Sequence, residues 1–493
     1  MAEGTHADLV QEAEGLLNAA RVAGEAWSAL TPKTRAARLR EAGKALLEEA
    51  EDLAGIVHEE TGKPIAEALS GDVLGLADVF NYWCTHGPGY LAPRKGRVPS
   101  LEFPGKRAVV EREARGVVAV ISPWNYPVAL PMRVMVPALL AGNGVVLKPS
   151  EVTPRTGAWL VERLRAHLGP VVGLMAGDGS AGAALVAAGP DMVHFTGSTT
   201  TGQSVAMACA ERGIAYDAEL GGKDVAIVLD DVDVTRAAAG IAWGIAHNAG
   251  QDCASIERVV VHHGVAQTFV PALVKAMEAI ASEIPDLTTP LQRSKVLSHI
   301  SDAIDRGATV RTGGVPEGDA PVPPTLLQDV PREAMAWVDE TFGPVAVLEV
   351  HDTEEALVAA ANDTVFGLGC SVWSKDVARA ERLGRQVKTG MLWVNNTAFT
   401  GGIADLPWVG RGASGGGVTS SPESLAHMTR PRMVLVDKAS APEPWWYPYG
   451  ETLEGLMRAV IERHRSGGLF ATLKTLSALQ ARTKVVSGRR DDG

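Results

Sequence analysis

Cysteine is scarce in this chain of 493 residues, and Cys84, Cys209, Cys253 and Cys370 lie far apart without a C-x-x-C pair. This spacing excludes a disulfide framework and a zinc signature, because both need paired or clustered cysteines. We therefore expect a reducing compartment and no metal site.

Basic residues are in the minority, with 46 Lys and Arg against 58 Asp and Glu and a net charge of −12. Such a molecule repels a phosphate backbone or an acidic lipid surface, which disfavours nucleic acid and membrane as partners. The longest uncharged stretch, Gly116 to Met132, has only 17 residues and is interrupted by three prolines. It is too short to span a bilayer.

The N-terminus carries Glu3, Asp8, Glu12 and Glu14 where a signal peptide needs a basic start and an apolar run. We therefore expect no export signal and a cytoplasmic protein. With 46% hydrophobic and 21% charged residues, the composition is that of a globular chain. At about 100 to 200 residues per domain, its length corresponds to two to four domains.

The first ninety residues show apolar side chains at helical spacing, with Thr31 and Pro32 placed to begin a helix. Alternation between Lys95 and Arg115 predicts a long hairpin, an arm outside the core. Short apolar runs then alternate with helical segments, which is typical of a parallel α/β sheet whose ligands bind where strands end. These runs are residues 117–121, 144–147, 192–195, 225–229 and 259–261.

The last segment, from Lys438 onward, differs from the rest. After an aromatic entrance that includes Trp445 and Trp446, its apolar spacing predicts an amphipathic helix pair broken at Gly467-Gly468. The pair can pack on this or a neighbouring subunit, or lie on a membrane. We favour packing, because its polar face is mixed in sign.

Three residues are candidates for catalysis, and each has a plainer interpretation. Cys253 lies in a polar, glycine-containing run that favours an exposed thiolate, although a lone cysteine is more often a small buried hydrophobe. Glu219 precedes a buried strand and can act as a base of raised pKa, or cap a turn. Asn125 can donate to an oxyanion, or simply form a proline-rich turn.

Two more turns follow predicted strands. Gly197 and Gly202 form a G-x-x-x-x-G turn that can aim backbone N–H groups at a phosphate, although it is more often just a tight turn. Lys148 and Glu151 follow a strand and can hold ribose hydroxyls, or form a solvated pair.

Taken together and in this order, these segments resemble the NAD(P)-dependent aldehyde dehydrogenase superfamily. The resemblance covers roughly 435 residues, far more than one motif explains. Its motifs are Thr61-Gly-Lys-Pro, Pro123-Trp-Asn-Tyr-Pro, Lys148-Pro-Ser-Glu, Phe195-Thr-Gly-Ser, Glu219-Leu-Gly-Gly-Lys, Gly250-Gln-Asp-Cys, Glu340-Thr-Phe-Gly-Pro and Asn395-Asn396.

The resemblance implies an α/β fold with a variant doubly wound cofactor domain, an α/β catalytic domain and a β-arm for oligomerisation. We expect the NAD-binding domain at 1–94 and 116–220, and the catalytic domain at 221–405. The arm then comprises 95–115 and 406–437, and 438–493 is a C-terminal helical extension. A homodimer or homotetramer is the implied assembly.

The resemblance also implies roles for residues. Cys253 is the expected nucleophile, Glu219 the base, and Asn125 the oxyanion donor together with the N–H of Cys253. The Glu151 carboxylate favours NAD over NADP, because it accepts from a ribose 2′-hydroxyl and repels a 2′-phosphate. The expected cofactor-binding residues are Trp124, Lys148, Glu151, Thr196, Gly197, Ser198, Gly202, Leu220, Glu340 and Phe342.

The implied reaction is oxidation of a small-molecule aldehyde to a carboxylic acid through a cysteine thiohemiacetal and a thioester. A different enzyme hypothesis is an acylating relative that releases the acyl group to coenzyme A or phosphate, although Glu219 argues for water. Two further hypotheses are a catalytically retired family member that acts as a binding protein and a Cys-His hydrolase that uses His247 or His194.

The sequence departs from the family pattern at two places. Asp252 directly precedes the nucleophile, where a carboxylate aimed at the thiol raises its pKa. Trp408 and Val409 replace an expected glycine pair, which puts the geometry of that loop in question.

Overall fold

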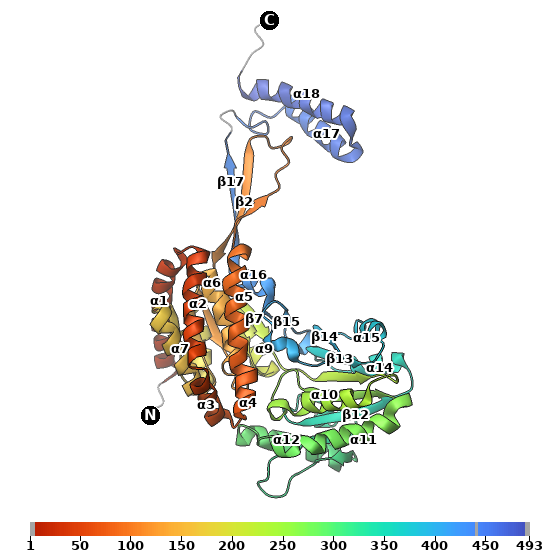
Figure 1. Cartoon of the computed structure of the whole chain (residues 1–493). Helices are drawn as coiled ribbons and strands as arrows, with labels where there is room; N and C mark the ends of the chain where they lie inside the picture. The colour runs from red at the N-terminus through yellow and green to blue at the C-terminus, as the bar shows by residue number, and fades with distance from the viewer. Residues whose placement is uncertain (1–4, 439–441, 489–493) are drawn as a thin grey trace. The chain divides into compact units, whose positions relative to one another are not determined.

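The computed structural model describes residues 5–438 and 442–488. Glu3 of the acidic N-terminus and the first three residues of the C-terminal segment after Lys438 lie outside the described residues. The chain divides into two compact units (Figure 1). The main unit comprises Met1–Tyr90 and Ala114–Arg430, and the arm unit comprises Leu91–Glu113 and Pro431–Gly493.

The first sheet of the main unit is parallel, with strand order β5-β4-β3-β6-β7. Every residue of β3 and β4 is buried, which explains why continuous apolar runs marked these strands in the sequence. The strand order reverses between β3 and β6, where ligands of such sheets bind. The strands are β3 (Val117–Ile121), β4 (Gly144–Lys148), β5 (Val172–Leu174), β6 (Met192–Thr196) and β7 (Ala215–Glu219).

Some helices pack directly against this sheet, and the others pack against other helices. The predicted start of the second helix is confirmed: the side chain of Thr31 accepts a hydrogen bond from the N–H of Thr34, and Pro32 is its first residue. The helices are α1 (His6–Ser28), α2 (Pro32–Glu48), α3 (Ala50–Thr61), α4 (Ile65–Glu67), α5 (Leu74–Tyr90), α6 (Ala129–Ala141), α7 (Pro154–Leu168), α8 (Gly179–Ala187) and α9 (Thr199–Arg212).

The second sheet has the order β10-β11-β12-β9-β8-β13-β14 and is parallel except for β10 at one edge. Its strands are β8 (Asp224–Val228), β9 (Ile256–His262), β10 (Thr309–Thr312), β11 (Thr325–Gln328), β12 (Val345–His351), β13 (Gly369–Trp373) and β14 (Met391–Val394).

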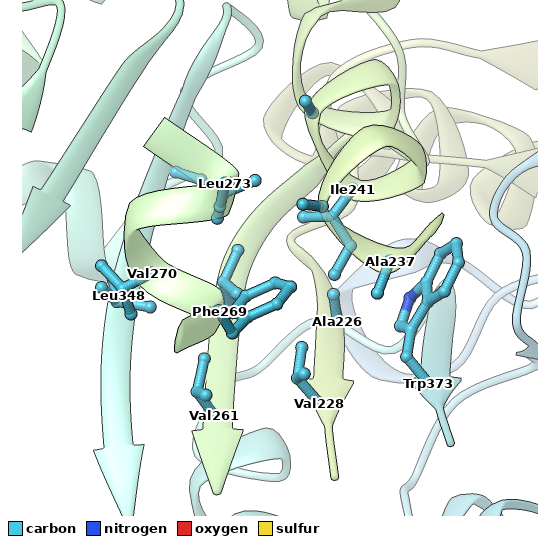
Figure 2. Packing of buried hydrophobic residues seen from close by; sticks show 14 of the residues in the cluster. Ala226, Val228, Ala237, Ile241, Val261, Phe269, Val270, Leu273, Leu348 and Trp373 are labelled. Carbon is cyan, nitrogen blue, oxygen red and sulfur yellow. The ribbon is translucent and has the colours of Figure 1, made fainter. Parts of the chain in front are cut away.

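A hydrophobic core covers one face of this second sheet (Figure 2). Phe269 of α11 (His263–Ile280) and Ile241 of α10 (Val234–Ala246) are fully buried there above Val228 and Val261 of the strands. The other face packs on α14 (Glu354–Ala361) and α15 (Val377–Gly384). The core therefore holds the strand ends that carry the candidate residues.

The remaining elements of the main unit are short, apart from α12. A π-helical turn, η1 (Ala68–Val73), joins α4 to α5. The others are η2 (His247–Gly250), η3 (Ala281–Glu283), α12 (Pro290–Asp305), α13 (Met335–Val338), η4 (Phe399–Gly402), β15 (Trp408–Val409), η5 (Gly412–Ser414), β16 (Val418–Thr419) and α16 (Ser421–His427).

The arm unit is built on three strands in the order β1-β2-β17. Its predicted hairpin is present, because β1 (Arg94–Gly96) pairs antiparallel with β2 (Lys106–Ala114). The third strand, β17 (Thr429–Asp437), lies at the edge of this sheet. Both β2 and β17 have one end in the main unit.

The predicted helix pair is confirmed as α17 (Glu451–Ser466) and α18 (Gly468–Val486), separated at Gly467. The guanidinium of Arg482 is buried and donates hydrogen bonds to the carbonyl oxygens of Pro444, Trp446 and Pro448. This one side chain fixes the aromatic entrance against α18. Within the described residues, no helix combines the length and the apolar character needed to cross a membrane.

Deletion of residues 439–493 tests what this extension contributes. It removes Arg463, which pairs with Glu102, and Glu443, one of the carboxylates that pair with Lys106. We expect a lower thermal transition or an altered oligomeric state, because these charges lose partners, with the covalent chemistry predicted for Cys253 intact. Differential scanning fluorimetry and light scattering measure this. Liposome binding lost on truncation, with stability and assembly unchanged, would contradict the packing interpretation.

Candidate active site

Cys253 lies in the loop between η2 and β9, and unusual backbone geometry places it there. Asn248 and Ala249 adopt left-handed conformations with φ of 53° and 54°, followed by Gly250 at 69°. A Cβ at Gly222 would collide with the carbonyl oxygen of Cys253. Glycine at position 222 therefore lets the segment after Glu219 pass directly over the cysteine.

The thiol of Cys253 is a weak acid in this site. Burial raises its pKa well above the usual value, and the nearby Asp252, Glu219, Glu340 and Asp224 carboxylates raise it further. The predicted effect of Asp252 on the thiol therefore has the expected direction. The carboxylate of Asp252 itself is held by Tyr126, whose hydroxyl donates to it at 2.9 Å, and by the N–H of Ala254.

Asn125 follows β3 and is brought to the cysteine loop. Its side-chain amide donates to the carbonyl oxygen of Gln251 at 3.0 Å. Its own carbonyl oxygen accepts from Lys63 at 2.8 Å and from the Asn248 amide at 3.0 Å. The structure thus brings the predicted oxyanion donor within two residues of Cys253 along the neighbouring loop.

Glu219 ends β7, where its side chain is buried. Burial raises the pKa of its carboxyl to about 7, opposed by hydrogen bonds from Thr419 and by the charge of Arg133. The N–H and hydroxyl of Thr419 donate to it at 2.8 and 2.6 Å. A carboxyl with a pKa near neutrality is suited to general-base catalysis.

Trp408 shapes the surroundings of this base. β15 and β16 form a two-stranded antiparallel sheet in which Trp408 is opposite Thr419. The bulky residue that replaces the expected glycine is therefore built into the strand pair that holds Glu219. The loop is ordered around it rather than disrupted.

Glu340 contacts the Glu219-Leu-Gly-Gly-Lys segment, because its carboxylate accepts from the N–H of Gly222 at 2.8 Å. Burial and the charge of Glu257 raise the pKa of Glu340 to about 7. A buried ion pair supports this segment: Lys223 Nζ contacts Glu257 at 2.6 Å and also donates to the Asp339 carbonyl oxygen. Sequence reasoning gave Lys223 and Glu257 no role.

The predicted cofactor residues gather at the carboxyl ends of β4 and β6. Lys148 ends β4, and its Nζ lies 3.5 Å from the carboxylate of Glu151, whose side chain is 56% exposed. Thr196 ends β6, and Gly197 leads to Ser198, which caps α9 by accepting from the N–H of Thr201. These ends share one edge of the sheet, as a bound nucleotide requires.

The other predicted cofactor residues lie around this edge. The rings of Trp124 and Phe342 meet edge to face, with centroids 5.7 Å apart. Gly202 is buried in the first turns of α9, and Leu220 follows β7. The structure therefore brings Phe342, distant in the sequence, to the turn that carries Asn125.

The two histidines of the hydrolase hypothesis are not placed to act on Cys253. His247 stacks on Trp243 at 4.5 Å and contacts Glu67 at 3.3 Å. His194 is fully buried in β6, and burial lowers its pKa. Neither forms a hydrogen bond with Cys253 in the described part of the chain, where no cluster of His, Cys, Asp and Glu suited to a metal occurs either.

Arg133 is a residue that sequence reasoning missed. It is the single charged residue of α6, and burial lowers the pKa of its guanidinium, which nearby Glu219 and Cys253 raise. It lies 5.6 Å from the ring centre of Trp408 and makes no hydrogen bond or ion pair with the residues that the structure describes. Trp408 belongs to the apolar cluster on which Cys253 packs. The sequence does contain one signal for Arg133, because it is a lone charged residue in an otherwise apolar helix.

Comparison with known proteins identifies the family. The model of the aldehyde dehydrogenase family matches residues 3–434. The chain is 36% identical over 443 residues to 4,4′-diapolycopene aldehyde oxidase of Methylomonas, covering 88% of this chain and 83% of that protein.

Solved structures agree. A putative aldehyde dehydrogenase from Burkholderia cenocepacia superposes with a TM-score of 0.84 at 32% identity, covering 89% of this chain and 92% of that one. An indole-3-acetaldehyde dehydrogenase complexed with NAD⁺ gives 0.82 at 30%, covering 87% and 89%.

The chain belongs to the aldehyde dehydrogenase family. The predictions of the family, of the fold class and of an aldehyde-oxidising enzyme are confirmed. The NAD complex of the structural relative agrees with the predicted cofactor.

The pKa of Glu219 predicts a pH profile. A base must be deprotonated to act, so turnover limited by Glu219 rises with pH through about 7 and is flat above it. Thr419 lowers this pKa by hydrogen bonding, so Thr419→Val moves the midpoint of the steady-state profile upward. A Glu219→Gln variant has no such inflection. A midpoint unchanged by Thr419→Val contradicts the assignment.

Proposed function

We propose that this enzyme oxidises an aldehyde to its carboxylic acid with NAD, through a thioester on Cys253 that water hydrolyses. One observation carries the proposal: the thiol of Cys253, the amide of Asn125 and the carboxyl of Glu219 come together from three separate segments. When bound, NAD accepts the hydride.

In the first half-reaction, the thiol of Cys253 loses its proton to solvent, the thiolate sulfur bonds to the aldehyde carbon, and the carbonyl oxygen takes up negative charge. The N–H of Cys253 and the second N–H of the Asn125 amide, which the bond to Gln251 leaves available, donate to that oxygen. The hydrogen on the carbon then leaves as hydride, and the carbon–oxygen double bond reforms as a thioester.

In the second half-reaction, Glu219 takes a proton from a water molecule that attacks the thioester. The carbon–sulfur bond breaks, the acid leaves, and the thiol is regenerated. The pKa of about 7 for Glu219 supports this role, because the carboxyl accepts and returns a proton near neutral pH. Release to water, not to coenzyme A, follows from the presence of this base.

For the cofactor, we propose that Ser198 and the N–H groups after Gly197 hold the pyrophosphate at the start of α9. Lys148 and Glu151 hold the adenosine ribose, and Glu340 holds the nicotinamide ribose. The exposed carboxylate of Glu151 is held by two long contacts on one oxygen, from Lys148 at 3.5 Å and from the Ser150 hydroxyl at 3.4 Å, which leaves its other oxygen able to accept from ribose hydroxyls. Its charge supports NAD over NADP.

The domain division remains a proposal, which the positions of the strands support. The five-stranded sheet falls within 116–220 and the seven-stranded sheet within 221–405. We propose that the arm forms the contact of a homodimer or homotetramer, because edge strand β17 exposes Met433 and Leu435. Four cysteines without disulfides support the cytoplasm as the compartment.

The two half-reactions are separated by a pair of substitutions. Cys253→Ala abolishes NADH formation, because the nucleophile is lost, and leaves NAD binding intact. Glu219→Gln gives a stopped-flow burst of NADH followed by slow turnover, since the base acts after hydride transfer. Cys84→Ala, at a buried position in α5, is the control and keeps the wild-type rate.

Substantial turnover by Cys253→Ala contradicts the proposal. Loss of the burst in Glu219→Gln shows that this residue acts earlier. Dependence of acid release on added coenzyme A favours the acylating hypothesis.

We also propose a substrate class: aldehydes that carry a carboxylate. This proposal rests on Arg133, a partly buried cation that makes no ion pair with the described residues and lies near the sulfur of Cys253. Its guanidinium carbon lies 5.6 Å from the ring centre of Trp408, and a guanidinium is suited to a planar, bidentate partner such as a carboxylate. Cationic aldehydes are disfavoured by the same charge.

Arg133→Met tests this class. A charge-assisted hydrogen bond is worth about 1.5–3 kcal/mol, so kcat/KM for a semialdehyde acid falls by about ten- to hundredfold. An uncharged aldehyde of equal length is the internal control and keeps its kcat/KM. Assays above the pKa of Glu219 avoid the indirect effect of Arg133 on that residue. Equal losses for both substrates contradict the proposed class.

A further inference from the structure

A buried ion pair contacts the turn that carries Asn125, and neither of its residues has a direct role in the proposed reaction. Lys63 Nζ contacts the carboxylate of Asp72 at 2.7 Å, and both side chains are at most 1% exposed. Removing two charges from water costs free energy that their mutual attraction only partly returns. Stability alone is therefore a weak reason for this pair.

The ammonium group of Lys63 has three neighbours. Besides Asp72, it donates to the carbonyl oxygen of Asn125 at 2.8 Å and lies 4.2 Å from the ring centre of Tyr126. An ammonium has three N–H donors, so each is directed at a fixed partner. Two of these partners are consecutive residues of the turn that carries the oxyanion amide.

Asp72 holds the other end of that turn. Its second oxygen accepts from the N–H groups of Val128 and Ala129, at 3.1 and 3.3 Å, where α6 begins. Asp72 lies in the π-helical turn η1. Such turns add a residue to a helix and re-aim its side chains, often at functional sites.

We propose that Lys63 and Asp72 are positioning residues that fix Asn125 against Cys253 and so set the rate of hydride transfer. The inference rests on the role of Asn125 in the proposed function. Asn248 donates to the same carbonyl oxygen of Asn125, so the turn is clamped from both the N-terminal helices and the cysteine loop. Of these two donors to the Asn125 carbonyl oxygen, Lys63 is the charged one.

The test measures the stopped-flow NADH burst, whose rate reports hydride transfer and whose amplitude counts active sites. Lys63→Met lowers the burst rate per active site by about tenfold or more, as for an oxyanion donor displaced from its position. The dissociation constant for NAD is unchanged. In Lys63→Met/Asp72→Asn both charges are gone and an acceptor for α6 remains, so this variant serves if the single substitution does not fold.

Arg35→Met is the matched control. Arg35 is also a buried cation anchored to α6, at the opposite end, where it donates to the carbonyl oxygen of Leu140 at 2.8 Å. Its loss lowers thermal stability in the same way and leaves the burst rate at the wild-type value. Any effect of general destabilisation thus appears in both variants.

A double-mutant cycle with Asn125→Ala decides whether Lys63 acts through Asn125. Without the amide, Lys63→Met changes the burst rate by less than about twofold, because the two residues act as one unit. Full multiplication of the two effects overturns the inference, as does a Lys63→Met burst rate equal to that of Arg35→Met. A wild-type burst in Asn125→Ala alone instead rejects the proposed role of Asn125, and the inference with it.

Discussion

The close approach of the segment after Glu219 to the backbone of Cys253 is the constraint on which the rest of the site depends. No side chain fits between Gly222 and the carbonyl oxygen of Cys253. The N–H of the same glycine donates a hydrogen bond to the Glu340 carboxylate. One glycine therefore fixes the nucleophile, the base and a predicted cofactor residue relative to one another, although they come from three parts of the chain.

An excess of acidic groups follows from this packing. Glu219 and Glu340 are buried close to the thiol, and each has its pKa raised to about 7 by burial first. Asp252 remains satisfied by Tyr126 and Ala254. Because the charges of Glu219 and Glu340 both raise the pKa of the Cys253 thiol, protonation of either carboxylate lowers the cost of forming the thiolate. The positive charge of the Arg133 guanidinium opposes this accumulation of negative charge, because it lowers the pKa of Glu219.

Three strands that are buried along their whole length were predictable from the sequence. β3, β4 and β8 are fully buried, so their apolar runs are continuous, and the pattern predicted the parallel sheets. The break at Gly467 and the cap at Thr31 were visible because backbone chemistry is local. The edge strand β10 was missed, since three of its four residues are exposed and lack an apolar pattern.

The candidate catalytic residues were found because their motifs occur in a fixed order, whereas the residues that support them were not. Lys63 and Asn125 are 62 positions apart, and a lone lysine in a sequence reads as a solvated charge until its burial is known. In the sequence, Trp408 put the geometry of an expected glycine loop in question. In the structure it is opposite Thr419 in the strand pair that holds Glu219. Motif order identifies the reacting groups, but the charges and rings that orient them are set by long-range packing, which motifs do not encode.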